Sequence, residues 1–280
     1  MSTMRFHKIY LEISNICNLK CAFCPGTGRK PKVMTEAEFS RLLPKLRHWA
    51  DFLYFHLLGG PLCPPRLERF LELAGEAGFK VILTTNGTLL PKQQEMLLRS
   101  PALHKVNISL HAFEANDLAV PFEEYLRGCF TFGQAAEGKK LVVYRLWNNG
   151  GANEKNQQIL EEMKDFFPKE WAEGRKGTAI GDRVFLEYGD KFDWPDLSAE
   201  EGGEQVFCYG LRDQIGVLCD GTVVPCCLDH EGDLALGNLF EQELDVILDS
   251  PRAQAIYKGF QNKKAAEELC RKCGYARRFG

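Results

Sequence analysis

The sequence predicts an α/β fold in which strands and helices alternate to build a parallel sheet. Apolar runs rich in β-branched residues recur at regular intervals, and helix-like segments lie between them. The 280 residues, 45% of them hydrophobic, suffice for one large domain or for a domain with an appendage. About six strand–helix units fit either an open doubly wound sheet or a partial barrel, and their period alone does not choose between the two.

The predicted strands are short apolar runs that end in polar residues. They span residues 8–13, 52–58, 80–85, 105–110, 140–146 and 183–188. Functional groups of parallel α/β folds gather at the carboxyl ends of the strands. The polar residues at those ends are Ser14, Asn15, Gly59, Gly60, 84–87, Ser109, His111, 145–148 and 187–189.

Four helices are predicted between these strands. Residues 35–50 open with TEAE, in which Thr35 and Glu38 have the spacing of a capping box. Residues 65–77 and 91–99 each begin with a proline, which the first turn of a helix tolerates. Residues 157–167 have apolar residues at helical spacing.

The composition changes after Tyr188, which predicts a division of the chain. Residues 191–207 are acidic and contain Gly and Pro, as a linker does, and Asp220-Gly221 between two short β runs indicates a hairpin. We therefore expect a barrel domain over 1–190, a linker over 191–207 and a small domain of a hairpin and helix over 208–280.

Charge and hydropathy exclude several classes of protein. A formal net charge of −3 with 26% charged residues excludes a disordered chain or a highly basic one, so no stable nucleic-acid binding is expected. No apolar segment reaches membrane-spanning length, and the N-terminus lacks a signal peptide. We therefore expect a cytoplasmic protein. Its 11 cysteines then indicate metal or redox chemistry rather than disulfides.

The first cysteine motif follows the first predicted strand. Cys17, Cys21 and Cys24 are spaced so that three thiolates can hold three corners of one iron–sulfur cluster. No fourth cysteine follows at ferredoxin spacing, and structural zinc sites normally have four protein ligands. The motif therefore predicts a [4Fe–4S] cluster with one open iron.

The segment CNLKCAFC after a first strand resembles the signature of the radical S-adenosylmethionine (SAM) enzymes. The resemblance implies a partial (β/α)6 barrel and a [4Fe–4S] cluster whose open iron binds SAM. It also implies reductive cleavage of SAM to a 5′-deoxyadenosyl radical, with an electron donor such as flavodoxin or ferredoxin. The SAM-binding residues that it implies are Phe23, Gly59, Gly60, Asn86, Ser109 and Arg145.

One position departs from the family pattern. The segment Leu58-Gly59-Gly60-Pro61 resembles the GGEP motif that meets the methionyl amine of SAM, but Gly60 stands where the acidic residue is usual. A weaker affinity for SAM is expected only if that carboxylate orients the loop.

A second set of cysteines lies in the C-terminal part: Cys208, Cys226, Cys270 and Cys273. It resembles the single-cluster twitch form of the SPASM extension, which implies an auxiliary [4Fe–4S] cluster with four thiolates. A structural zinc site is the alternative that the spacing permits. Cys219 and Cys227 could compete as ligands, although neighbours on a strand, such as Cys226 and Cys227, point to opposite faces. Cys63 and Cys129 stand alone and are expected to be buried.

Three titratable residues in apolar strands are candidates for catalysis: Glu12, His56 and Glu187. A buried carboxylate without a partner is costly, so Glu12 and Glu187 should pair with Arg145, a lysine or substrate. His56 has the alternative of a hydrogen-bonded core histidine.

The resemblance implies abstraction of a hydrogen atom from a small-molecule or nucleotide substrate. A fainter resemblance to the queuine lyases, carried by residues 8–26, YFHLLG and VVYRLWN, suggests queuosine 5′-phosphate as the substrate. A peptide-modifying maturase and an alcohol dehydrogenase are the alternatives within the family. A non-catalytic α/β binding module stapled by zinc is the alternative outside it.

Overall fold

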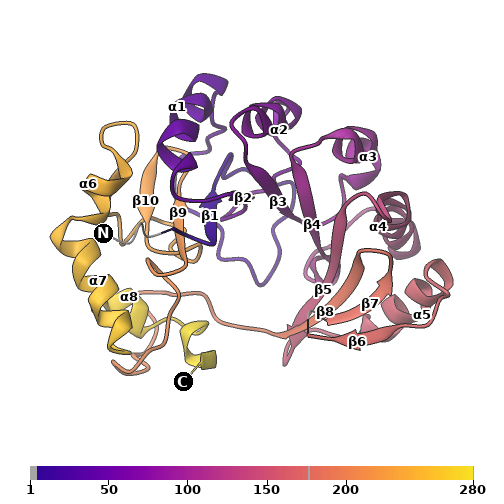
Figure 1. Cartoon of the computed structure of the whole chain (residues 1–280). Coiled ribbons are helices and arrows are strands. Elements are labelled where there is room, and N and C mark those ends of the chain that lie inside the picture. The colour runs from indigo at the N-terminus through magenta and orange to yellow at the C-terminus, as the bar shows by residue number, and fades with distance from the viewer. Residues whose placement is uncertain (1–4, 176, 280) are drawn as a thin grey trace.

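The computed structural model describes residues 5–175 and 177–279. Its centre is a curved sheet of eleven strands in the described part of the chain, in the order β11-β10-β9-β1-β2-β3-β4-β5-β8-β7-β6 (Figure 1).

Six neighbouring strands of this sheet run parallel to one another. They are β1 (Lys8–Leu11), β2 (Phe52–Phe55), β3 (Lys80–Thr85), β4 (Leu103–Ser109), β5 (Leu141–Asn149) and β8 (Val184–Asp190). Helices α1 (Glu36–Arg47), α2 (Leu67–Glu76), α3 (Leu90–Arg99), α4 (Phe122–Ala136) and α5 (Asn156–Phe166) cover the outer face (Figure 1). This arrangement confirms the predicted partial (β/α)6 barrel.

Alternation along the strands separates an apolar outer face from a more polar interior. On β1, Ile9 and Leu11 are buried in the core against the helices, whereas Tyr10 belongs to a separate inner cluster. Phe39 of α1 packs on Phe55 of β2, with ring centroids 5.7 Å apart. The helices therefore pack on the outer face of the sheet and leave its inner face available for a functional site.

Helix α1 begins as the capping box predicts. The Thr35 hydroxyl accepts a hydrogen bond from the Glu38 amide, and the Glu38 carboxylate accepts one from the Thr35 amide. Two backbone N–H groups at the start of the helix, which have no acceptor within the helix, thereby gain side-chain acceptors.

Two features of the barrel escaped the sequence analysis. Helix α4 was not predicted, because its sequence FEEYLRGCFTFGQAA contains two glycines, a threonine and several aromatics that favour helix weakly. Strands β6 (Ala172–Gly174) and β7 (Gly177–Gly181) form an antiparallel ribbon beside β8, inserted between α5 and the sixth parallel strand. The barrel is therefore interrupted before its last strand.

The C-terminal part continues the same sheet. Strand β9 (Gln214–Val217) pairs in parallel with β1, and β10 (Thr222–Val224) returns antiparallel to β9 after the turn predicted at Asp220-Gly221. Strand β11 (Gly237–Asn238) follows, and then the helices α6 (Leu244–Leu248), α7 (Pro251–Gln261) and α8 (Glu268–Arg271). Residues 191–207 contain no helix or strand, as expected of the linker. The division of the chain into domains stays a prediction.

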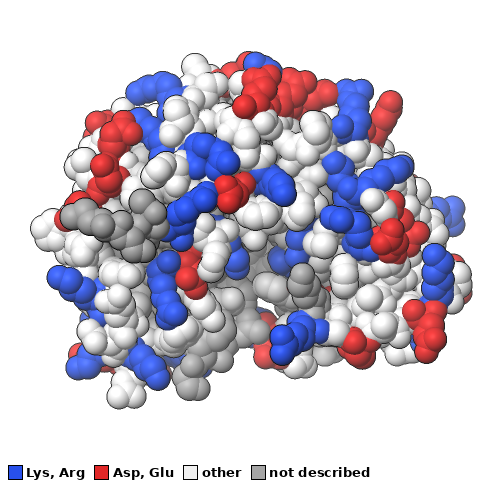
Figure 2. Space-filling view, in the orientation of Figure 1, with Lys and Arg blue, Asp and Glu red and all other residues white. Residues whose placement is uncertain are grey.

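The surface carries both signs of charge. On the face shown in Figure 2, Lys and Arg side chains are interspersed with Asp and Glu. Among the described residues, no helix combines the length and apolar character needed to cross a bilayer. The prediction that nucleic acid is not bound stays untested.

Gly133 allows α4 to pack against β5. A Cβ atom at this position would lie 2.0 Å from the hydroxyl oxygen of Tyr144, which donates a hydrogen bond of 2.9 Å to the Cys129 carbonyl. We predict that Gly133→Ala lowers the free energy of unfolding by about 1–3 kcal/mol through overpacking. Chemical denaturation measures this loss, and Tyr144→Phe in the same chain should recover part of it. Unchanged stability of Gly133→Ala would contradict the packing described.

Candidate active site

The loop after β1, residues 16–33, carries the three-cysteine motif and is called the cluster loop below. Its two ends are held together beside the sheet. The Asn15 side chain donates to the Lys30 carbonyl at 2.9 Å and accepts from the Lys32 amide at 2.7 Å, while Ser14 bridges to Val33. The loop therefore closes on itself at the carboxyl end of β1.

Asparagine side chains contact the cluster loop next to its cysteines. The amide nitrogen of Asn116 donates to Cys21 Sγ at 3.1 Å, and its oxygen accepts from the Lys20 amide. Asn86, after β3, donates to the Asn18 side chain at 3.1 Å.

Partial burial raises the pKa of Cys21, the Asn116 hydrogen bond opposes this shift, and the charges of the neighbouring Cys24 and Cys17 raise the pKa further. The cationic iron–sulfur core of a bound cluster would offset the repulsion between these neighbouring thiolates.

Gly59 and Gly60, at the end of β2, lie directly against the cluster loop. The Gly60 amide donates to the Ile16 carbonyl at 2.9 Å. Gly59 has φ +74°, and a Cβ there would lie 2.2 Å from the Ser14 carbonyl oxygen. The two glycines therefore allow a close backbone approach between β2 and the cysteine loop.

The Cys63 thiol occupies the space beside position 60, where this chain has a glycine. A Cβ on Gly60 would lie 2.8 Å from Cys63 Sγ and 3.4 Å from Cys17 Sγ. The Cys63 thiol, 3.5 Å from the Asn18 side-chain oxygen, thus fills the space that a larger residue would need. The expectation that Cys63 is a buried bystander was wrong: it is partly exposed and adjoins the cluster loop, whereas Cys129 is buried as expected.

Residues predicted to bind SAM meet on the inner side of the barrel. The Phe23 ring, from the cluster loop, lies 5.0 Å from the His111 ring, and His111 Nδ1 is 3.0 Å from the Arg145 carbonyl oxygen. Ser109 is the register partner of Arg145 on the neighbouring strand. The structure therefore brings Phe23, Ser109 and Arg145 together, while their role in binding SAM stays a prediction.

The Arg145 guanidinium lies in the barrel interior with little access to solvent. Its Nε is 3.4 Å from Glu187 Oε2, and the guanidinium lies 4.4 Å from the centre of the Trp147 ring. Burial lowers the pKa of Arg145, and the Glu187 charge opposes that shift. The expected pairing of Glu187 with Arg145 is present.

Two tyrosines that the sequence analysis did not single out accompany His56 inside the barrel. The Tyr10 ring lies 5.1 Å from the Tyr54 ring and 6.1 Å from the His56 ring. Burial, with a smaller effect of the Arg145 charge, lowers the pKa of His56 to about 4. The imidazole is therefore neutral near pH 7. Alternation along β1 and β2 was the signal that could have identified both tyrosines.

Glu12 lies in a setting different from the one expected. Its carboxylate is fully buried and pairs with Arg29 of the cluster loop, at 2.6 and 2.8 Å, rather than with Arg145 or a lysine. Burial disfavours the charged form of Arg29, but the Glu12 contacts prevail and raise the pKa of the guanidinium. This partner was not predictable from the sequence, because no local pattern indicates how the loop that carries Arg29 folds.

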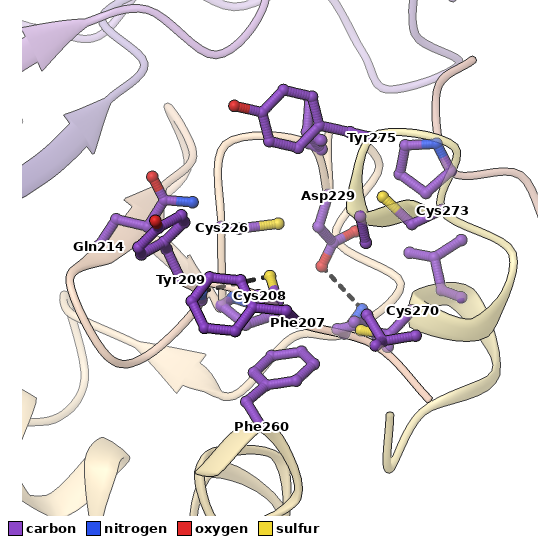
Figure 3. Close-up of a pocket in the computed structure, with 18 residues that line it drawn as sticks. Phe207, Cys208, Tyr209, Gln214, Cys226, Asp229, Phe260, Cys270, Cys273 and Tyr275 are labelled. Atoms are coloured by element: carbon purple, nitrogen blue, oxygen red, sulfur yellow. Dashed lines mark hydrogen bonds between the residues drawn. The ribbon is translucent and has the colours of Figure 1, made fainter. Parts of the chain in front are cut away.

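The four C-terminal cysteines line one apolar cavity. Figure 3 shows Cys208, Cys226, Cys270 and Cys273 around the space between Phe260 and Tyr275. Burial raises the pKa of Cys226 well above its usual value, and the charges of Cys208 and three further cysteines add to the shift. Among the described residues, no three His, Cys, Asp or Glu side chains converge as a single-ion site would require. The thiols surround the cavity instead.

Cys219 and Cys227 do not line this cavity. Cys219 is buried beside Arg29, 3.9 Å from its Nη1. Cys227 packs with Tyr10 in the inner cluster, and a hydrogen bond with the Tyr10 hydroxyl opposes the burial that raises the pKa of Cys227 to about 11. The dipeptide Cys226-Cys227 therefore has one thiol on the cavity and the other on the barrel interior.

Both sets of thiols fit the groups that the sequence implies. Four cysteines around an apolar cavity, one of them buried and three partly buried, are a donor set for a fully ligated cluster, and three cysteines beside a polar barrel mouth leave one position open. Burial that raises thiol pKa values disfavours free thiolates, and a bound iron–sulfur cluster supplies the missing positive charge.

The contact between Gly60 and Cys63 is testable. We predict that Gly60→Ala lowers occupancy of the first cluster several-fold, because the new methyl group displaces Cys63 and, through it, the loop at Cys17. Iron content and visible absorbance after anaerobic reconstitution measure this. The double variant Gly60→Ala/Cys63→Ala should recover occupancy. Equal occupancy of the first cluster in wild type and Gly60→Ala would show that the Cys63 thiol does not restrict the space beside position 60.

Replacing one cysteine of the second set should remove one cluster and leave the other. We expect wild-type protein to bind about eight irons and Cys270→Ala about four, with cleavage of SAM retained. Cys129→Ala is the matched control, since its thiol is buried and belongs to neither set. Stoichiometric zinc in Cys208, Cys226, Cys270 and Cys273 with no loss of iron in Cys270→Ala would support the zinc alternative.

Family models match both parts of the chain. The model of the radical SAM superfamily matches residues 11–171, which is more than half of the chain. A model described as an iron–sulfur cluster-binding domain, SPASM, matches residues 208–274 and includes all four cysteines of the second set.

Two curated relatives illustrate the range of activities. The SAM-dependent 2-deoxy-scyllo-inosamine dehydrogenase of Niallia circulans is 22% identical over 96% of this chain and 92% of its own length. The GTP 3′,8-cyclase of Synechococcus sp. (strain CC9902) is 32% identical over 51% of this chain, and the match spans only 42% of the cyclase.

Solved structures share the fold at low identity. BtrN in complex with SAM (AdoMet) and 2-DOIA has a TM-score of 0.60 at 18% identity, covering 96% of this chain and 92% of BtrN. SuiB of Streptococcus suis has a TM-score of 0.65 at 18% identity, covering 97% of this chain and 71% of SuiB. With its cysteine loop at the mouth of a partial (β/α)6 barrel, the chain belongs to the radical SAM superfamily and carries a SPASM-type iron–sulfur domain.

Proposed function

We propose that this radical SAM enzyme oxidises an alcohol group of a small polar molecule, as a dehydrogenase that uses both sets of cysteines. The substrate occupies the barrel interior, between the cluster loop and the Cys226-Cys227 dipeptide. The queuine lyase resemblance receives no support from the comparisons, whose named relatives are of other types.

The observation that carries the proposal is a polar barrel interior connected to both sets of thiols. On one side, Phe23 contacts His111, which contacts the strand that bears Arg145. On the other side, Tyr10 contacts Cys227, which adjoins Cys226 in the chain. A small molecule held between these groups is close to both redox sites.

When bound, SAM and the open-site cluster supply a radical that takes a hydrogen atom from a C–H bond, and the closed cluster accepts an electron. Oxidation of an alcohol to a ketone removes one hydrogen atom, one proton and one electron. The protein must therefore provide an acceptor for the hydroxyl proton.

His56 is the group that we assign to this proton. Its pKa of about 4 makes the imidazole neutral at pH 7, so one ring nitrogen carries a lone pair that can accept a proton. Glu187 is engaged by Arg145, and Glu12 by Arg29. The Arg145–Glu187 pair presents a hydrogen-bonding edge that would orient hydroxyl or amine groups of the substrate.

The near-full-length relative supports this reaction type. The match covers 92% of the Niallia circulans protein, which is named as a dehydrogenase. A peptide-modifying activity is the second candidate, because SuiB has been crystallised with a precursor peptide and has the same fold. SuiB is longer, however, and 71% of it is covered by this chain.

The reaction can be assayed directly. Reconstituted protein should be incubated anaerobically with SAM, a reductant and a panel of aminocyclitols, polyols and nucleosides. We expect one class of alcohols to raise 5′-deoxyadenosine formation well above background, with one ketone formed per deoxyadenosine. Stimulation by peptides alone would favour the second candidate. Ketone formation without deoxyadenosine would contradict the proposal.

The role of His56 gives a separate prediction. His56→Gln should lower ketone formation by about 10²–10⁴-fold, while deoxyadenosine formation from SAM persists. In the wild type, the acid limb of ketone formation should have its midpoint near pH 4 rather than near 6.5, because protonation of the ring stops it acting as a base. Tyr54→Phe is the matched control, because it keeps an aromatic ring in the same cluster. An acid limb unchanged in His56→Gln would exclude His56 as the base.

A further inference from the structure

The carboxylate of Glu12 joins three separate segments of the chain. Arg29 donates from Nη2 to Oε1 at 2.6 Å and from Nη1 to Oε2 at 2.8 Å. The backbone amide of Cys219, in the turn between β9 and β10, donates to Oε2 at 3.0 Å. The Glu12 amide itself donates to the Val217 carbonyl at 2.9 Å. Glu12 thus connects β1, the cluster loop and the C-terminal part.

A second contact joins the cluster loop to the C-terminal part next to the first. The Gly28 amide donates to Glu231 Oε1 at 3.0 Å. Arg29 follows Gly28, and both lie within five residues of Cys24. On the other side, Cys219 and Glu231 flank Cys226. Both contacts therefore arise from the cluster loop just after Cys24, and they reach the C-terminal part at two positions on either side of Cys226 in the sequence.

The energetics of the Glu12–Arg29 ion pair indicate that it fixes the geometry of the segments it joins rather than adding stability. The Glu12 side chain is fully buried and that of Arg29 is 14% exposed, so removal of both charges from water is costly. An apolar pair of similar volume would stabilise such a position about as well. What the ion pair adds is geometry: a bidentate fork and a backbone amide share one carboxylate, which fixes all three in one arrangement.

We propose that Glu12 is a positioning residue that holds the cluster loop, through Arg29, in a fixed relation to the C-terminal domain, through the Cys219 amide. Both carboxylate oxygens are used by these donors, so Glu12 acts through other groups rather than on substrate. The pair sets the spacing between the first cluster and the auxiliary one. The consequence for electron transfer rests on the proposed dehydrogenase function, but the mechanical coupling does not.

Amide hydrogen exchange of the reconstituted protein tests this coupling without any substrate. In Glu12→Gln, we expect peptides that contain Gly28 and Cys219 to exchange at least about tenfold faster, because a buried guanidinium is left unpaired and both segments open. Peptides of α2 and α3 should exchange as in wild type. Glu68→Gln is the matched control, since it breaks an exposed pair with Arg99 on that side of the barrel.

A second variant separates positioning from general stability. Glu12→Leu/Arg29→Met replaces the pair by apolar side chains, and its denaturation midpoint should lie close to wild type while the Cys219 and Gly28 peptides still exchange fast. Wild-type protection in this double variant would overturn the proposal, because burial alone would then account for the pair. Faster exchange spread evenly over the chain in Glu12→Gln would overturn it as well. Failure to find an alcohol substrate would affect only the proposed function.

Discussion

The parallel pairing of β9 with β1 joins the barrel sheet to the C-terminal part of the chain. Lys8 to Leu11 are in register with Gln214 to Val217, so a strand 206 residues later in the chain extends the barrel sheet at its edge. The carboxyl ends of neighbouring parallel strands lie at the same edge of a sheet. The cluster loop after β1 and the turn after β9, which contains Cys219, therefore emerge side by side at this edge of the sheet.

This pairing also gives the barrel interior its character. The outer faces of β1 and β2 are apolar and bury Ile9 and Phe55 under the helices. The inner faces carry Tyr10 and His56, and the returning strand β10 with its following residues adds Cys227 to the same inner surface. Polar groups of barrel strands and a thiol of the C-terminal part thus face one space. Such an arrangement is compatible with the proposed alcohol oxidation, in which the substrate loses a hydrogen atom, a proton and an electron.

The sequence predicted those features that depend on local spacing. The interval between Cys17, Cys21 and Cys24 indicated an open cluster site, and strand–helix alternation indicated parallel units. The four later cysteines were predicted as one set although they come from distant segments, and the cavity between Phe260 and Tyr275 brings them together. The resemblance to a known family, rather than periodicity, decided between a barrel and an open sheet.

Features that depend on tertiary contact were not predictable. The length of chain between Glu12 and Arg29 gives no hint that a loop arginine returns to the end of β1. The glycine at position 60 reads as a lost acidic residue in the sequence, whereas the structure shows that the Cys63 thiol fills the space beside it. Helix α4 was missed because tertiary packing against Phe167 and Tyr144 stabilises a segment with weak helix propensity.

The two sets of cysteines are expected to hold two clusters of unlike accessibility, one with an open iron and one fully ligated by the protein. Electron paramagnetic resonance of the dithionite-reduced, reconstituted protein tests this expectation most directly, with and without SAM. We expect two signals, one of which changes on addition of SAM and is absent from Cys17→Ala, while the other is unaffected by SAM. A single signal, or two signals that both respond to SAM, would contradict this expectation.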